Sequence, residues 1–143
     1  MLNYPMRFEV EGTAGAGITA GWTARAAEGR AVAMAVPPEF GGPGGGFSPE
    51  DLYALALLKC FTATFTVIAE RSRLVYEAIR LEGVLTVDRD DRGAPWMKKF
   101  ELRAKLTGCV DGERGLRLLR KTSESCLILN SVKTEKSFEF SLE

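Results

Sequence analysis

The cysteines of this chain are the residues whose chemistry is most readily defined, because the sequence contains three cysteines and no histidine. Cys60 lies within an apolar helical pattern, and Cys126 follows a second helical pattern. Imidazole is the usual activator of serine and cysteine nucleophiles, so cysteine chemistry here depends on Arg, Lys, helix dipoles and carboxylates. This combination points to thiol redox chemistry.

Cys60 and Cys126 are 66 positions apart, which excludes a local CxxC motif and leaves their contact open. Each cysteine alone is typical of a small core hydrophobe. Two features argue against that interpretation: both positions are predicted to face inward from helices, and polar or charged residues adjoin both. These neighbours are Lys59, Thr62, Ser123, Ser125 and Asn130.

Cys109 is interpreted as incidental. By the alternation of a strand, it lies on the same outer face as Glu101, Arg103 and Lys105, unless Gly108 makes a bulge.

Composition excludes several classes of protein. The 143 residues are expected to form a single domain, 1–143, and 19 basic residues balance 19 acidic ones, which argues against nucleic-acid binding. The first ten residues carry Arg7 and Glu9 without a continuous apolar core, so we expect no secretory signal and a cytoplasmic protein. In that reducing compartment a reversible or catalytic disulfide is expected rather than a structural one.

The N-terminal third, 5–37, alternates with period two and predicts a three-stranded antiparallel meander. The residues expected on one face are Met6, Phe8 and Val10, then Ile18, Ala20, Trp22 and Ala24, and then Val32, Met34 and Val36. Turns are expected at 12–17 and 28–29. The loop 41–46 is glycine-rich but lacks the Lys-Ser or Lys-Thr of a phosphate-binding loop.

A long central helix is predicted over 48–72. Ser48 suits the cap position, Pro49 the first turn, and Glu50 and Asp51 follow them. Lys59 is the only charge between Asp51 and Glu70, but threonines interrupt the apolar stretch, so we interpret it as a buried core helix and not a membrane span. One three-stranded sheet cannot wrap so apolar a helix, and a partner subunit is therefore expected.

The remainder of the chain, 77–142, returns to strand patterns. Strands are expected around 79–87 and 100–106, joined by a turn at 88–95, and a last strand is expected over 132–142. Asp111 can cap a helix in which Leu116, Leu119, Ser123 and Cys126 recur at helical spacing. Cys126 then faces inward if that helix continues.

Two segments carry a resemblance to a known family. They are Phe47-Ser48-Pro49-Glu50-Asp51-Leu52 with the later Lys59-Cys60-Phe61, and Cys126-Leu127-Ile128-Leu129-Asn130. They resemble the signature blocks of the OsmC/Ohr family, the osmotically inducible and organic hydroperoxide resistance proteins. The resemblance covers nearly the whole chain, and the region 38–42 is more similar to a less characterised OsmC-like branch.

The resemblance implies an α+β, OsmC-like fold in which antiparallel sheets wrap the long central helices of an intertwined homodimer. It also implies that Cys60 is the peroxidatic thiolate, which becomes a sulfenic acid, and that Cys126 is the resolving thiol. A dithiol reductant then restores both thiols, and in the hydroperoxide-resistance branch this is a lipoyl-bearing protein. No metal or organic cofactor is expected.

The resemblance assigns two charged residues to the site. Glu50 matches the acidic residue ten positions before the first cysteine, and about 15 Å of helix separates the two. We therefore expect Glu50 to serve Cys60 of the other subunit, with antiparallel helices crossing near Leu55; an acid favoured by the helix dipole is the alternative. For the arginine of a Gly-Gly-Arg motif the candidates are Arg30 and Arg25, and Lys59 is a further source of positive charge.

The sequence thus predicts a cysteine-based thiol peroxidase that reduces organic hydroperoxides, independent of membranes and nucleic acids. A pocket lined by aromatic residues would favour apolar peroxides. The candidates for that lining are Phe61, Phe65, Trp22 and Trp96. Two alternatives stay open: a stress-associated binding protein with little peroxidase activity, and a redox sensor.

Overall fold

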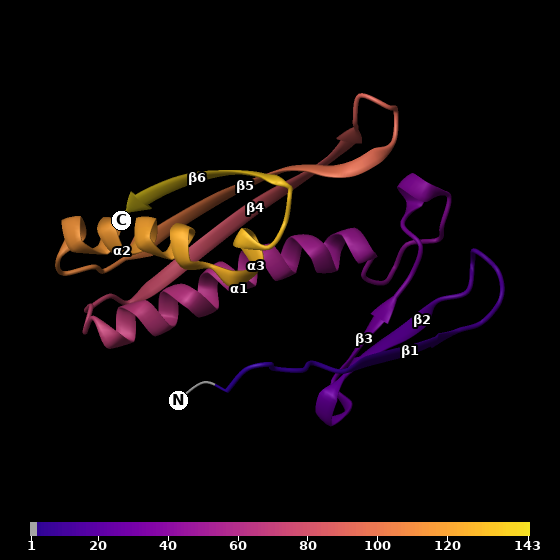
Figure 1. The fold of residues 1–143 in the computed structure, drawn as a ribbon, viewed down its shortest axis with the longest axis horizontal. Coiled ribbons are helices and arrows are strands. Elements are labelled where there is room, and N and C mark those ends of the chain that lie inside the picture. The colour runs from indigo at the N-terminus through magenta and orange to yellow at the C-terminus, as the bar shows by residue number, and fades with distance from the viewer. Residues whose placement is uncertain (1–2) are drawn as a thin grey trace. The chain divides into compact units, whose positions relative to one another are not determined.

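The computed structural model describes residues 3–143 as a mixed α+β chain with two three-stranded sheets (Figure 1). By its internal contacts the chain divides into two compact units, the first ending at Leu52 and the second comprising Tyr53–Glu143. Each unit contains one of the sheets.

The sheet of the first unit is the predicted meander. Its strands are antiparallel in the order β1-β2-β3 and are β1 Val10–Ala14, β2 Trp22–Ala26 and β3 Ala31–Met34. The expected start of the first strand at Met6 is wrong, because pairing begins at Val10 with Ala26. Gly12, expected in a turn, pairs with Ala24 inside the sheet.

The central helix α1, Pro49–Arg71, confirms the predicted helix to within a residue at each end. Its start is fixed by a reciprocal cap: Asp51 N donates to Ser48 Oγ and Ser48 N donates to Asp51 Oδ2, both at 3.0 Å. Each bond satisfies a backbone donor that the first turn leaves without a helical partner.

One stripe of α1 lies in the hydrophobic core of the second unit. Every fourth residue along it is buried, namely Leu57, Phe61, Phe65 and Ala69. By length and composition α1 could also cross a membrane, and only 22% of its most apolar window is buried within the chain. One face of the helix therefore packs in the core, as expected, and the rest is half-buried or exposed within this chain.

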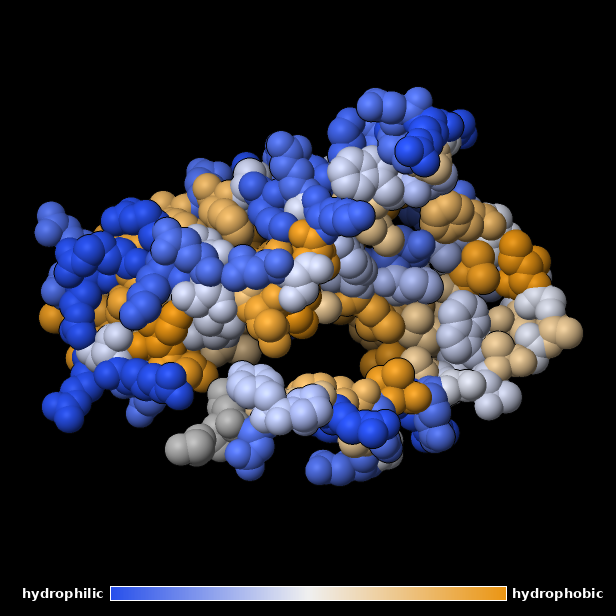
Figure 2. Space-filling view, viewed as in Figure 1, coloured by the Kyte–Doolittle hydropathy of each residue, from blue (hydrophilic) through white to orange (hydrophobic). Residues whose placement is uncertain are grey.

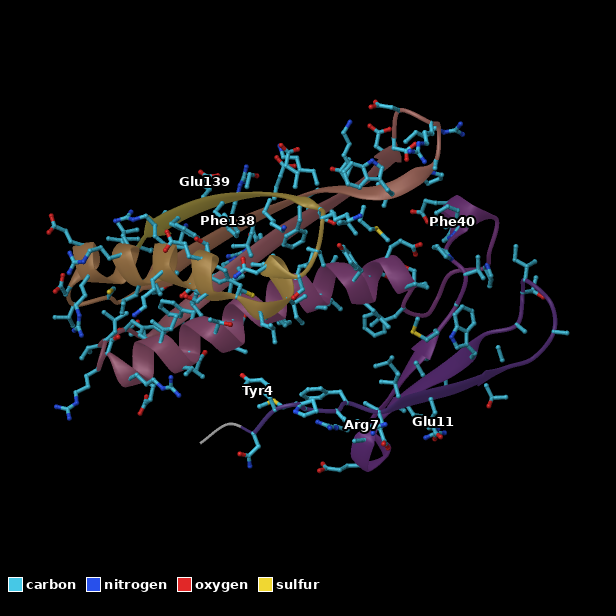
Figure 3. All side chains as sticks on the ribbon, in the orientation of Figure 1. Tyr4, Arg7, Glu11, Phe40, Phe138 and Glu139 are labelled. Carbon is cyan, nitrogen blue, oxygen red and sulfur yellow. The ribbon has the colours of Figure 1, made fainter. Side chains whose placement is uncertain are left out.

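The sheet of the second unit provides the other side of this core. Its strands, in the order β4-β5-β6, are β4 Ala78–Arg89, β5 Pro95–Thr107 and β6 Glu135–Leu142. Alternate residues of β5 are buried, namely Phe100, Leu102, Ala104 and Leu106. Consecutive residues of β6 point to opposite faces of the sheet: Phe138 lies near Phe61 of α1, whereas Glu139 pairs with Arg103 on the outer face (Figure 3).

The last strand, β6, runs parallel to β5, which differs from the antiparallel sheets implied by the family resemblance. A parallel pair requires a crossover connection. Here the crossover consists of α2, Gly112–Ser125, and the short helix α3, Leu127–Asn130. Asp111 caps α2 as predicted, since its side chain accepts a hydrogen bond from Arg114 N.

The structure decides two conditional expectations about the cysteines in this region. The helix that precedes Cys126 ends at Ser125, so Cys126 is not part of it, although its side chain is fully buried. Cys109 is half-buried against the core and not on the outer face, because Gly108, with φ +65°, turns the chain directly after β5. Gly108 thus changes the direction of Cys109, as the sequence analysis allowed, but it does so after the end of the strand and not as a bulge within it.

Candidate active site

Cys60 lies on α1 directly before the core residue Phe61, at the edge of the buried stripe. Its side chain is half-buried. The Cys60 Sγ accepts a hydrogen bond of 3.4 Å from the backbone N–H of Ile128, which belongs to the first turn of α3. The crossover helix therefore presents a backbone donor to the sulfur that the sequence analysis assigned as the nucleophile.

Cys126 occupies the bend between α2 and α3. Its backbone is extended, with φ −72° and ψ 114°, so that it ends one helix and caps the next. The side-chain amide of Asn130 donates a hydrogen bond of 2.9 Å to the backbone carbonyl of Glu124, which links α3 to α2 across the bend. The thiol is consequently directed into the core, where it is 0% exposed.

The structure brings the thiols of Cys60 and Cys126 together. Burial raises the pKa of the Cys126 thiol from 9.0 to about 11, and the hydrogen bond with the Cys60 side chain also raises it. Burial disfavours the charged thiolate, so Cys126 is protonated at neutral pH. Both cysteines are free thiols, and as contacting neighbours they are the pair in this chain able to form a disulfide.

Thr64 is a neighbour of this pair that the sequence analysis did not assign to the site. Its Oγ1 lies 4.0 Å from Cys60 Sγ, and its hydrogen bond to the Cys126 side chain lowers the pKa of that thiol. The signal in the sequence was the spacing of four residues from Cys60, which places two side chains on one face of a helix. The Ile128 N–H has no comparable signal, because its position follows from the bend at Cys126.

Glu50 is half-buried in the first turn of α1, and its Oε2 is buried without a hydrogen-bond partner among residues 3–143. About 15 Å of helix separates it from Cys60, so the two do not meet within one helix. A buried carboxylate oxygen without a partner is costly. Glu50 is therefore a residue whose interactions within this chain are incomplete.

The candidate arginines lie in the first unit, whereas both thiols lie in the second. Arg30 is exposed, and its Nε donates to the carbonyl of Ala27 at 3.1 Å. Arg25 is exposed on β2, and Lys59 is exposed on α1. Lys59, which lies in the same unit as the thiols, forms no hydrogen bond with either sulfur among residues 3–143.

Two of the four aromatic residues expected to line a pocket, Phe61 and Phe65, do not do so. Phe61 and Phe65 are both 0% exposed and pack in the core, Phe61 against Phe138 and Phe140 and Phe65 against Tyr76. They cannot line an open cavity of this chain. Among residues 3–143 no group of three or more Cys, Asp or Glu side chains is placed to hold a metal ion.

Comparison with solved structures finds the same fold in several bacterial proteins. An OsmC-like protein of unknown function from Vibrio cholerae superposes with a TM-score of 0.83 at 19% identity, covering 94% of this chain and 99% of that one. An organic hydroperoxide resistance protein from Elizabethkingia anophelis, with thiocyanate bound, gives 0.75 at 17% identity, covering 97% and 98%. OhrB of Bacillus subtilis, an organic hydroperoxide resistance protein, gives 0.64 at 19%, covering 96% and 98%.

At these identities the structural likeness establishes the fold alone. In a search of curated proteins, none matched the chain. The model of the family described as OsmC-like protein matches residues 42–141, a segment that includes α1, the second sheet and both thiols of the pair. On this match, the chain belongs to the OsmC-like protein family.

Proposed function

We propose that this protein is a cysteine-based thiol peroxidase that reduces organic hydroperoxides. The observation that carries the proposal is the contact between a half-buried Cys60, whose sulfur accepts a backbone N–H, and a buried, protonated Cys126. The likeness in fold to proteins named for organic hydroperoxide resistance supports the same chemistry.

In the first step the Cys60 thiolate attacks the peroxide oxygen that does not carry the organic group. The O–O bond breaks, Cys60 becomes a sulfenic acid, and the alkoxide takes a proton and leaves as an alcohol. The Ile128 N–H, which donates to the Cys60 sulfur at 3.4 Å, holds that sulfur in place for the attack.

In the second step the Cys126 sulfur attacks the Cys60 sulfenic acid. The S–O bond breaks, and the hydroxide leaves with the proton of the Cys126 thiol as water. A dithiol reductant, such as a lipoyl-bearing protein, then reduces the disulfide and completes the cycle. We place this cycle in the cytoplasm, where thiols are kept reduced.

We further propose that the working unit is an intertwined homodimer and that Glu50 serves Cys60 of the partner subunit. The uncovered faces of α1, with Leu55 36% and Val67 47% exposed, support a second chain as their cover (Figure 2). The buried Glu50 oxygen without a partner supports a missing neighbour. Arg30, with Arg25 as the alternative, is the cation that we assign to orient the peroxide.

The test is turnover of cumene hydroperoxide with dihydrolipoamide as reductant. We expect Cys60→Ser to abolish turnover, because the nucleophile is lost, and Cys126→Ser to leave a sulfenic acid that is not converted to the disulfide. Cys109→Ser is the matched control and retains turnover, since that thiol bonds to the Asp111 carbonyl and has no role in the cycle. Activity that persists in Cys60→Ser would refute the mechanism.

A second candidate function is a stress-associated binding or redox-sensing protein. Arg30 supports this second candidate. Its Nε already donates to the Ala27 carbonyl, although Arg30 is the cation expected to activate the nucleophile. This candidate predicts reversible Cys60–Cys126 oxidation with negligible turnover of hydroperoxide by the wild-type protein.

A further inference from the structure

Every second residue of one stretch of α1 is a threonine, namely Thr62, Thr64 and Thr66. Thr62 Oγ1 donates to the Leu58 carbonyl at 3.3 Å, and Thr66 Oγ1 donates to the Thr62 carbonyl at 2.8 Å. Both bonds are the usual way in which a threonine in a helix satisfies its hydroxyl, through the carbonyl four residues earlier. Neither hydroxyl is left for a neighbouring side chain.

Thr64 differs from these two threonines. No carbonyl in the described part of the chain accepts its hydroxyl, and its polar neighbours are instead the sulfurs of Cys60, at 4.0 Å, and of Cys126. It is half-buried next to the core, where a hydroxyl without a partner is costly and a valine of the same shape would pack equally well. Helix formation therefore does not explain the hydroxyl of Thr64, whereas an interaction with the two thiols does.

We propose that Thr64 is a positioning residue for the resolving step, in which its hydroxyl donates a hydrogen bond to the Cys126 sulfur as that sulfur attacks the Cys60 sulfenic acid. The inference rests on the proposed peroxidase cycle, and it assigns to Thr64 the second step of that cycle.

The chemistry of the second step explains why such a donor is useful. Cys126–SH and Cys60–SOH give the disulfide and water, so the thiol proton must leave before or during the attack. Cys126 is fully buried, and its side chain is hydrogen-bonded to that of Cys60. A hydroxyl that donates to the sulfur stabilises the developing thiolate in a site where burial opposes it.

The experiment measures two rates separately in single-turnover reactions with cumene hydroperoxide: formation of the Cys60 sulfenic acid, by trapping with dimedone, and formation of the disulfide. Loss of one hydrogen bond predicts that Thr64→Val slows disulfide formation about 3- to 10-fold, and more than it slows sulfenic acid formation. Thr64→Ser keeps the hydroxyl and should restore the rate. Thr62→Val is the matched control, because it removes a hydroxyl that bonds only to the Leu58 carbonyl.

A second measurement does not require peroxidase activity. In a Cys60→Ser background, the pH at which Cys126 reacts half-maximally with iodoacetamide should shift upward by about 0.5 to 1 unit on adding Thr64→Val. With Cys60 retained, disulfide closure driven by diamide should be slower in Thr64→Val than in wild type. If peroxide is not reduced at all, the proposed function fails while these two readouts still test Thr64.

Equal rates of disulfide closure and equal Cys126 titrations in wild type and Thr64→Val would overturn the proposal. The same holds if Thr62→Val slows closure as much as Thr64→Val does, because the effect would then belong to the helix and not to the hydroxyl at the sulfurs.

Discussion

The two thiols of the pair have unequal surroundings, although they touch. Cys60 is half-buried and accepts an N–H from Ile128, while Cys126 is fully buried in the bend between two helices. Burial keeps Cys126 protonated at neutral pH. This asymmetry supports the proposal that Cys60 attacks and Cys126 resolves, in a chain that contains no histidine.

The raised pKa of Cys126 predicts a loss of stability at alkaline pH. The unfolded thiol ionises above 9.0, whereas the folded thiol keeps its proton up to about 11. The unfolded state therefore binds fewer protons in this interval, and the free energy of unfolding falls as pH rises through it, by up to about 3 kcal/mol. Below the unfolded pKa the full contribution is present.

The measurement is urea unfolding of wild type and of Cys126→Ala at several pH values from about 8 to 11. Other groups titrate in this range, so the relevant quantity is the difference between the two pH dependences. We expect the wild-type curve to fall more steeply. Parallel curves would show that burial does not hold the Cys126 proton.

At the level of residues, sequence reasoning found the cysteine pair but not its neighbours. A separation of 66 positions in the sequence does not indicate whether the two cysteines are close in space, and the pairing was inferred from resemblance to a family. Thr64 was missed although its spacing of four residues from Cys60 placed both side chains on one face of a helix. The Ile128 N–H was missed because its position depends on where α3 meets α1, which no local pattern encodes. The prediction that Cys109 shares the outer face of the strand with Glu101 failed, because Gly108, with a positive φ of 65°, ends the strand before Cys109.

The elements that hold the pair depend on local capping. Ser48 and Asp51 exchange two hydrogen bonds at the start of α1, and Ser48 is itself buried. Such reciprocal caps could be predicted from Ser-Pro-Glu-Asp, and the helix ended within a residue of the prediction. The direction of β6 could not be inferred in this way, because alternation defines the faces of a strand and not its neighbour.

Removal of the cap should destabilise α1. We expect Ser48→Ala to lower the free energy of unfolding by about 1–2 kcal/mol, because the Asp51 N–H loses its partner. Chemical unfolding monitored by circular dichroism measures the change. Ser137→Ala, at an exposed position on β6, is the control and should change stability by less than about 0.5 kcal/mol. Equal effects would exclude a specific capping role.

On the scale of the whole molecule, α1 is more apolar than its own chain can cover. Its buried stripe faces the core, but Leu55 and Val67 are exposed, and only 22% of its most apolar window is buried. The sequence analysis inferred a partner subunit from the same imbalance. The family resemblance adds where the partner would lie, with two such helices crossing near Leu55.

We therefore expect Leu55→Glu to convert a dimer to a monomer, because a charge at the proposed crossing would be buried without a partner. Sedimentation equilibrium measures the change in mass. Val110→Glu is the control: this residue is 80% exposed in the connection between β5 and α2, and the variant should remain dimeric. A wild-type protein that sediments as a monomer would contradict the proposed assembly.

The meander β1-β2-β3 has a consequence for how the chain acquires its structure during synthesis. Within the chain, the described residues of the first unit bury three side chains, those of Met34, Ala35 and Ser48, and strands without a hydrophobic interior are marginal in water. The first unit, which leaves the ribosome before the second, is thus unable to fold autonomously. A fragment ending at Leu52 is expected to remain unfolded.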